Sequence, residues 1–190
     1  MVFNTLYSDP AIMRRAKKAY DEDFPNNVML EKFFQRAIFI TLQNKLYNAK
    51  YSLKFDPYEY RYKITKSKEV DAFLKGEYFK QIVERIFGIK KFKVKYEVTK
   101  FEAGDFTLLH DEAKEAAGID FIIDFSKEKG NRGHIKHLDE KQELVQINVN
   151  PNSLTFVNRN KEMKYIKYVS YKQKTPIVRV IGTILFKKQS

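Results

Sequence analysis

The chain has 190 residues, of which 43% are hydrophobic and 15% aromatic, so a single globular domain with a packed core is expected. It has no cysteine, which excludes disulfides and thiolate metal sites. It also has neither a long apolar run nor a signal peptide, so a cytoplasmic protein that does not span a membrane is expected. The formal net charge of +12 could provide a basic surface for nucleic acid or an acidic partner, but the explanation we favour is the composition typical of an AT-rich genome.

The first half, residues 1–90, is expected to be a support region of helices and short strands. Ser8, Asp9 and Pro10 are typical of a helix start with Ser8 as the cap, and Ser67 and Gly88 fit the start and end of a later helical region. The expected elements are a helix over 8–20, a strand over 28–30, a helix over 31–48, strands over 51–55 and 58–64, and helical structure over 67–87.

Aromatic residues alternate along the second of these strands, at Tyr58, Tyr60 and Tyr62. Side chains two apart on a strand share one face. The face therefore either packs under the helices, which we favour, or stacks nucleic-acid bases.

The second half, residues 91–188, is expected to form the core of the fold as a mainly β structure within an α+β domain. Eight short strands separated by turn signals such as EAGD, EKGN and NPNS favour a double-sheet jelly roll. The expected strands cover 92–101, 105–111, 119–126, 133–138, 144–149, 153–159, 164–171 and 177–186.

The most informative polar residues end the second of these strands. One of only three histidines, His110, is followed by Asp111 and Glu112. Alternation on a strand places His110 and Glu112 on one side, and an imidazole with a carboxylate is two-thirds of the triad that holds non-haem Fe(II). The alternative is a hydrogen-bonded structural histidine.

Several stretches, taken in order, resemble the prolyl 4-hydroxylase-like branch of the Fe(II)/2-oxoglutarate-dependent dioxygenases. The resemblance covers about residues 24–186 and depends on order and spacing more than on any single motif. It is carried by DFPNNVMLEKFF, VDAFLKGEYFKQIVERIFGI, FEAGDFTLLHDE, HIKHLDEKQELVQINVNPNSLTFVNR and MKYIKYVSYKQKTPIVRVIGTILF.

The resemblance implies a double-stranded β-helix, a cupin-like jelly roll, with N-terminal helices packed on its larger sheet. It implies that Fe(II), 2-oxoglutarate and O2 take part in the hydroxylation of a C–H bond. His110 and Glu112 would hold the metal, with Asp111 as the alternative carboxylate ligand. Arg179 would pair with the far carboxylate of 2-oxoglutarate. Phe101 stands where the family often has a tyrosine that contacts this co-substrate.

The third metal ligand is the main departure from the family pattern, because the segment KYIKYVSYKQK has no histidine. Lys164 or Tyr171 stands at the expected place. In a jelly roll the fourth strand neighbours the seventh, so His134 or His137 offers a replacement, and His134 is preferred. The alternatives are that both histidines are solvated, or that no third protein ligand exists.

The sequence therefore leaves two alternative functions, one of an enzyme and one of a binding module. The first is a dioxygenase that hydroxylates a protein or another macromolecule, including a nucleic acid or a ribosome-associated protein. The second is a catalytically degenerate jelly-roll module that binds nucleic acid or an acidic protein through its basic surface. Asp120 and Asp124 share a strand face and form either a second carboxylate site or, as we favour, a satisfied polar face. The substrate and the oligomeric state stay open.

Overall fold

The computed structural model of the chain describes residues 4–22, 26–107, 118–128, 135–138, 144–147, 149–159, 163–166 and 169–186. The N-terminal half contains the 3-10 helix η1 (Thr5–Ser8) and the helices α1 (Pro10–Glu22), α2 (Arg36–Tyr47), α3 (Lys68–Lys75) and α4 (Glu77–Phe87). Three strands lie among them, β1 (Asn27–Leu30), β2 (Ser52–Asp56) and β3 (Tyr60–Thr65). The remaining strands are β4 (Lys93–Phe101), β5 (Phe106–Thr107), β6 (Gly118–Asp124), β7 (Ile135–Leu138), β8 (Leu144–Ile147), β9 (Leu154–Asn158), β10 (Met163–Ile166) and β11 (Ile177–Leu185).

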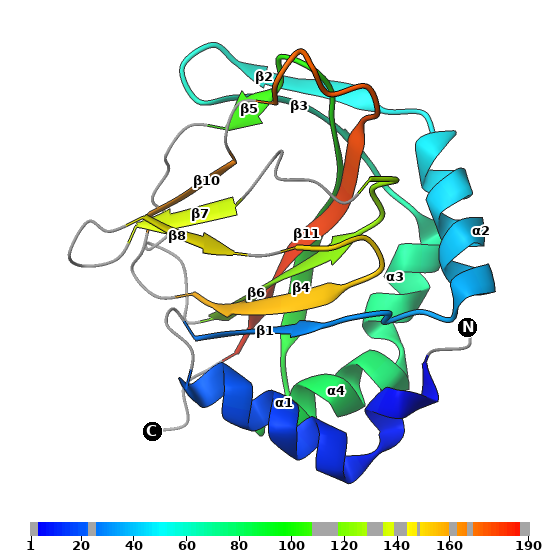
Figure 1. The fold of residues 1–190 in the computed structure, drawn as a ribbon, viewed down its shortest axis with the longest axis vertical. Helices are drawn as coiled ribbons and strands as arrows, with labels where there is room; N and C mark the ends of the chain where they lie inside the picture. The colour runs from blue at the N-terminus through cyan, green and yellow to red at the C-terminus, as the bar shows by residue number, and fades with distance from the viewer. Residues whose placement is uncertain are drawn as a thin grey trace.

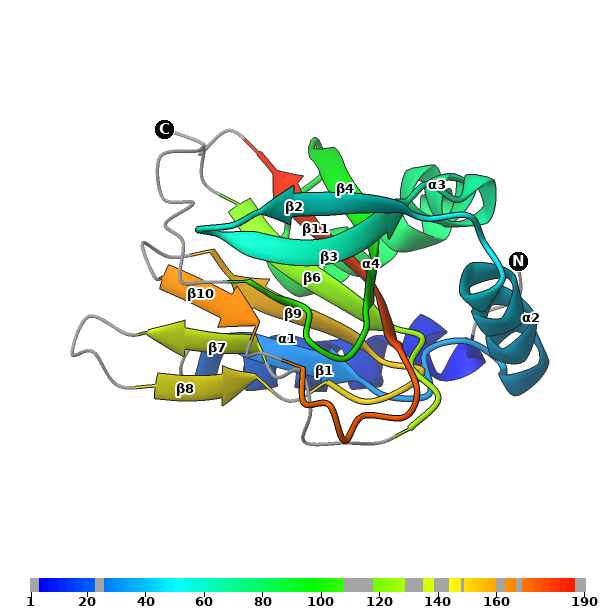
Figure 2. The same cartoon turned by 90° about the horizontal axis from the view of Figure 1, so that it is seen from above.

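The strands form two antiparallel sheets (Figure 1). The larger sheet has the order β1-β9-β6-β11-β4-β3-β2, with β5 paired to β3, and the smaller sheet has the order β10-β7-β8. Figures 1 and 2 show the smaller sheet on one side of the molecule and helices α2 and α3 on the other. Each of the eight strands expected between residues 92 and 186 has a described strand within its range, although residues 108–111 of the second one lie outside the described residues. The jelly-roll fold class is confirmed.

One face of the larger sheet packs against the helices. Strand alternation directs Ile119, Phe121 and Ile123 of β6 to this face, where the ring of Phe121 lies 5.5 Å from that of Phe79 in α4. Phe79 is fully buried, as are several other large apolar side chains of this core. Burial of an aromatic side chain of this size contributes roughly 2 to 3 kcal/mol. The helices are therefore held by apolar packing on the sheet face that carries the odd-numbered residues of β6.

Two helix starts differ from the sequence prediction. Ser8 belongs to η1, and the carboxylate of Asp9 instead accepts a hydrogen bond from the backbone N–H of Ala11 at 2.7 Å. Helix α2 begins at Arg36 and not at residue 31, because the backbone of Phe34 is bonded to Asn152. The other two signals are confirmed, since the Ser67 hydroxyl caps α3 by accepting from Val70 N–H, and Gly88 ends α4 with φ at 72°.

The aromatic residues of β3 lie on the sheet face that turns away from the helices. Tyr62 is buried and stacks on Phe101, with 5.0 Å between ring centroids, whereas Tyr58 lies in the turn before β3 and is largely exposed. The alternating face is therefore neither packed under the helices nor open along its length for base stacking. Along the described parts of the chain, every helix is too short or too polar to cross a membrane.

Candidate functional site

The second face of the larger sheet forms the interior of the barrel, opposite the smaller sheet. Its apolar part contains Phe101, Ile122 and Ile177 from β4, β6 and β11. Val169 and Val149, which follow the smaller sheet's strands in the chain, pack against these residues and close the space between the sheets. This face is where the residues predicted to serve a site should converge, because it is enclosed by both sheets.

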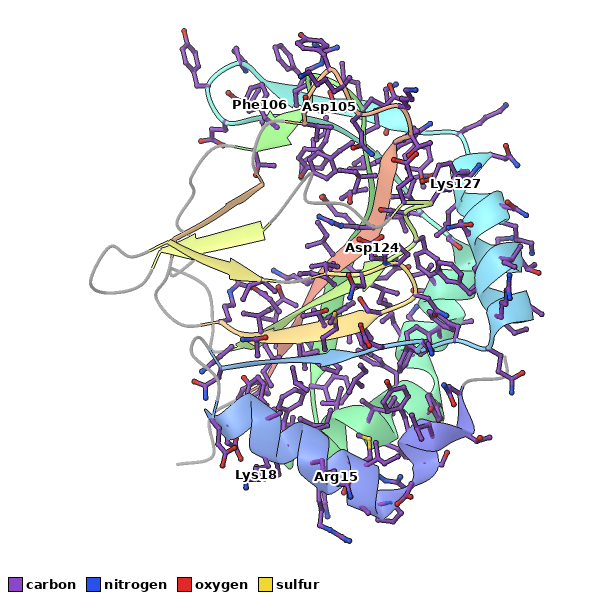
Figure 3. All side chains as sticks on the ribbon, in the orientation of Figure 1. Arg15, Lys18, Asp105, Phe106, Asp124 and Lys127 are labelled. Atoms are coloured by element: carbon purple, nitrogen blue, oxygen red, sulfur yellow. The ribbon has the colours of Figure 1, made fainter. Side chains whose placement is uncertain are left out.

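Arg179 lies on this interior face and is 4% exposed. It is paired in the β11–β6 register with Asp124, which is labelled in Figure 3. The Nε of Arg179 donates to Asp124 Oδ2 at 2.9 Å. Asp124 Oδ1 also accepts from the backbone N–H of Ser126 at 2.6 Å, and the Thr99 hydroxyl donates to the Arg179 carbonyl. Arg179 is therefore an interior residue bonded to a buried carboxylate, and it is not part of a solvated basic tail.

A second acid–base group lies further along the same two strands. The Thr183 hydroxyl donates to Asp120 Oδ1 at 2.6 Å and accepts from Arg159 Nη1 at 2.9 Å. Arg159 Nη1 is also 3.7 Å from Asp120 Oδ1, and both side chains are more than nine-tenths buried. Asp120 and Asp124 thus bind separate basic partners, in agreement with the favoured interpretation of a satisfied polar face.

Phe101 is 1% exposed and provides an apolar wall beside this row of charges. Tyr62 of β3 stacks on the Phe101 ring and so places a phenol beside this wall. The Tyr62 hydroxyl donates to Glu97 Oε2 at 3.1 Å, and Lys54 Nζ contacts Glu97 Oε1 at 2.9 Å. Burial raises the pKa of Tyr62, so the phenol is a neutral donor at physiological pH.

Sequence reasoning missed this arrangement of Tyr62 with Phe101. The period-two pattern placed Tyr62 on a strand face, but it did not identify which sheet face that was. The pairing of β3 with β4, at Ile64 opposite Thr99 and Thr65 opposite Val98, fixes the face.

The predicted metal ligands cannot be placed relative to these side chains. His110, Asp111, Glu112 and His134 lie outside the described residues, within the ranges 108–117 and 129–134. Within the described ranges no three His, Asp or Glu side chains gather as a metal site would require. The predicted metal site therefore stays a prediction.

The candidates for a third ligand differ in where their backbones lie. His137 of β7 is directly opposite Lys164 of β10, so the expected pairing of the fourth and seventh jelly-roll strands is confirmed. Tyr171 lies in a turn beyond the end of β10 and is 78% exposed, so its side chain is mainly in solvent. The geometry thus favours the β7–β10 pair over Tyr171 as the neighbourhood of a third ligand.

The donor chemistry of Arg179 fits a carboxylate ligand. A guanidinium presents five N–H donors in a plane and can bind a carboxylate with two parallel bonds. In this structure the Nε of Arg179 already bonds one carboxylate, that of Asp124. The guanidinium thus has the chemistry to bind a carboxylate, but any incoming carboxylate would meet the charge of Asp124.

The arrangement of two antiparallel sheets with N-terminal helices on the larger one is the double-stranded β-helix fold of the 2-oxoglutarate oxygenases, as the sequence resemblance implied. No family model matches the chain, and a search of curated proteins gives no match. Solved structures match it over more than nine-tenths of its length.

Three of these solved structures are informative. A prolyl-4-hydroxylase from Pseudomonas putida has a TM-score of 0.71 and 7% identity, covering 93% of this chain and 100% of that one. A 2OG-Fe(II) oxygenase family oxidoreductase from Burkholderia pseudomallei has a TM-score of 0.71 and 8% identity, covering 91% and 90%. A prolyl hydroxylase from Trichoplax adhaerens, in complex with a hypoxia inducible factor peptide fragment, has a TM-score of 0.69 and 8% identity, covering 95% and 92%. At these identities the likeness establishes the fold.

Proposed function

We propose that the chain is an Fe(II)- and 2-oxoglutarate-dependent oxygenase that hydroxylates a protein or another macromolecular substrate. The observation that carries this proposal is the position of Arg179. The side chain is buried on the interior face of the last described strand, within a double-stranded β-helix, and it bonds a carboxylate there. A guanidinium on the interior face of this fold is a planar donor group that suits an anionic ligand, and this supports the proposal.

In this proposal each residue has a separate role. Arg179 binds the far carboxylate of 2-oxoglutarate, and Phe101 with Ile177 forms an apolar wall that excludes water. His110, Glu112 and His134 are the proposed metal ligands. When bound, iron and 2-oxoglutarate supply the oxidation of a C–H bond by O2. The peptide in the Trichoplax structure supports a macromolecular substrate for this chain.

The test is an anaerobic titration of the protein with Fe(II) and 2-oxoglutarate. A weak visible charge-transfer band is expected for the wild type, and it should be lost or need much more 2-oxoglutarate in Arg179→Gln. Arg15→Gln is the matched control, because Arg15 is exposed on α1, and it should leave the titration unchanged (Figure 3). A wild-type protein that gives no band even at high metal and co-substrate would contradict the proposal.

A second candidate function is the catalytically degenerate binding module. It is favoured by the Arg179–Asp124 bond, which occupies part of the proposed anchor, and by the basic surface of α1. Arg14, Arg15, Lys17 and Lys18 are all exposed there, and Figure 3 shows Arg15 and Lys18 on the side of α1 that faces away from the sheets. Four neighbouring cations suit a phosphate backbone, although Lys17 and Lys18 also contact Asp21 and Glu22.

Binding to a nucleic acid at several salt concentrations tests this second candidate. If α1 contacts phosphates, affinity should fall steeply as salt rises, and Arg14→Gln with Arg15→Gln should make the salt dependence shallower by about two phosphate contacts. Substitution of the exposed Lys80 and Lys93 by Gln is the control, because these residues lie on α4 and β4 and not on α1. An affinity for nucleic acid that does not change with salt concentration would contradict this second candidate function.

A further inference from the structure

Three carboxylates on the interior face of the larger sheet each lie against a basic side chain. Asp124 lies against Arg179, Asp120 against Arg159, and Glu97 against Lys54, with the paired atoms separated by 2.9, 3.7 and 2.9 Å. Each carboxylate is on the interior face of the larger sheet, and the first two pairs are almost completely buried. Arg179 and Arg159 thus each already lie against a carboxylate of the protein, whereas a site for a dicarboxylate is expected to have an excess of positive charge.

We infer that Asp124 is an internal competitor for Arg179 that lowers the affinity of the barrel for 2-oxoglutarate. This inference rests on the proposed function, since it concerns the same interior site. Asp124 would thereby affect which ligands the interior site binds, although it is not one of the residues predicted to bind the metal or 2-oxoglutarate. The carboxylate of Asp124 takes the place at the guanidinium that an external carboxylate would otherwise share.

The position of Asp124 is fixed from several directions. Its carboxylate accepts from Arg179 Nε through one oxygen and from Ser126 N–H through the other. Its backbone N–H donates to Ser153 O at 3.2 Å, and its carbonyl accepts from Asn152 N–H at 2.9 Å. The carboxylate cannot turn away from Arg179 without breaking at least one buried hydrogen bond. Competition is thus a property of the folded chain and not of a mobile side chain.

The cost to an incoming ligand is electrostatic. A second carboxylate at Arg179 would place two like charges within a few ångströms of each other, in a setting where water screens them poorly. A guanidinium has five N–H donors and can bond more than one carboxylate, so the expected effect is weaker binding and not its complete loss. A ligand that lacks the far carboxylate would not experience this repulsion. Comparing its binding with that of 2-oxoglutarate therefore distinguishes competition at Arg179 from a general change in the shape of the site.

Asp124→Asn tests the inference, because the carboxamide keeps the shape and an acceptor oxygen but removes the buried charge. We expect Asp124→Asn to bind 2-oxoglutarate at least ten-fold more tightly than the wild type in anaerobic calorimetry with Fe(II). Binding of 2-oxobutanoate, which lacks the far carboxylate, should change less than two-fold. Asp120→Asn is the matched control, since it removes an equally buried carboxylate of the same strand that does not bond Arg179, and it should not raise affinity.

Two further measurements distinguish a change in affinity for 2-oxoglutarate from the effect of a folding defect in the variant. Asp124→Ser is a second variant, and it should show the same gain because it also lacks the charge. Unfolding temperature should rise more with added 2-oxoglutarate in either variant than in the wild type, because the ligand supplies a missing carboxylate. Adding Arg179→Gln to Asp124→Asn should remove the gain.

The outcomes separate this inference from the proposed function. Wild-type binding that depends on Arg179, with no gain in either Asp124 variant, overturns the inference and leaves the function in place. Binding by the Asp124 variants but not by the wild type supports the inference and contradicts an oxygenase function for the wild type. Binding by none of the proteins overturns both.

Discussion

The carboxamide of Asn152 pairs with the backbone of Phe34 in both directions. Phe34 N–H donates to Asn152 Oδ1 at 2.9 Å, and Asn152 Nδ2 donates to the Phe34 carbonyl at 2.9 Å. The Asn152 backbone also accepts from Phe33 N–H and donates to the Asp124 carbonyl. Asn152 therefore connects the segment before α2 to the end of β6, next to the Arg179 pair.

Asn152→Ala should destabilise the protein by about 3 kcal/mol. The change removes two side-chain hydrogen bonds worth about 1 kcal/mol each, and it places alanine at a φ of 61°, which costs about 1 kcal/mol more. Asn152→Gly tolerates the positive φ and should lose only about 2 kcal/mol. Urea unfolding measures both values, and an alanine variant as stable as the wild type would show that the Phe34 contact is unimportant.

Asn152 also illustrates what the sequence could and could not predict. Short apolar segments separated by turn signals predicted the strands of the second half, and the Ser67 and Gly88 signals located the start of α3 and the end of α4, because these features depend on neighbours in the chain. The start of α2 was misplaced because Phe34 is held by a residue 118 positions away. Local propensity contains no information about such a partner.

The candidate site shows the same division. Arg179 was predicted from the order of features in the chain, and its side chain lies in the interior, bonded to Asp124. Its bond to Asp124 depends on the register between β11 and β6, in which Arg179 is directly opposite Asp124. A shift of the register would give Arg179 a different neighbour. The sequence pattern indicated strands and their faces, but it did not fix this register.

Gly182→Ala should be among the most damaging single substitutions in the larger sheet. A Cβ atom at Gly182 would lie 2.5 Å from Phe121 Cζ and 2.6 Å from the carbonyl of Lys95, and that backbone atom cannot move without breaking the β11–β4 pairing. A loss of about 3 kcal/mol is expected. Chemical denaturation provides the measurement.

Gly88→Ala is the comparison for this prediction. Gly88 has φ at 72°, but a Cβ there would meet no atom within 4 Å. Only the backbone conformation opposes the change, so about 1 kcal/mol is expected. An equal loss in the two variants would show that steric exclusion at Gly182 has been overestimated.

Thr183→Val should cost about 2 kcal/mol, because the hydroxyl both donates to Asp120 and accepts from Arg159 inside the barrel. Valine has nearly the same shape, so the loss reports the hydrogen bonds and not a cavity. Thr183→Ser keeps the hydroxyl and should recover most of the stability. A serine variant as unstable as the valine variant would assign the effect to the methyl group.

The ion pair between Lys45 of α2 and Glu69 of α3 should make a small contribution to stability that disappears in acid. The hydrogen bond from Lys45 lowers the pKa of Glu69 from 4.5 to about 2. The folded-state pKa is below the unfolded value, so this stability is present above pH 4.5 and is lost as the pH falls towards 2. Both side chains are partly exposed, so the pair contributes less than about 1 kcal/mol.

Lys45→Met tests this pH dependence. The difference in unfolding free energy between wild type and variant should be largest near pH 6 and should shrink at pH values below about 4. Lys50→Met removes another exposed lysine of the same region and is the control. A difference that does not change with pH would mean that Lys45 acts through packing of its methylene groups.

The order of strands in the larger sheet has a consequence for how the protein is made. Strand β11 lies between β4 and β6, yet it is the last strand in the described chain. While the ribosome is still synthesising residues 177–185, the larger sheet is divided into two parts, one ending at β4 and the other at β6. The edges of these two strands stay unpaired until β11 pairs with both. Folding of the larger sheet should therefore be completed only after these residues have left the exit tunnel, and a nascent chain stalled earlier should be an effective chaperone substrate.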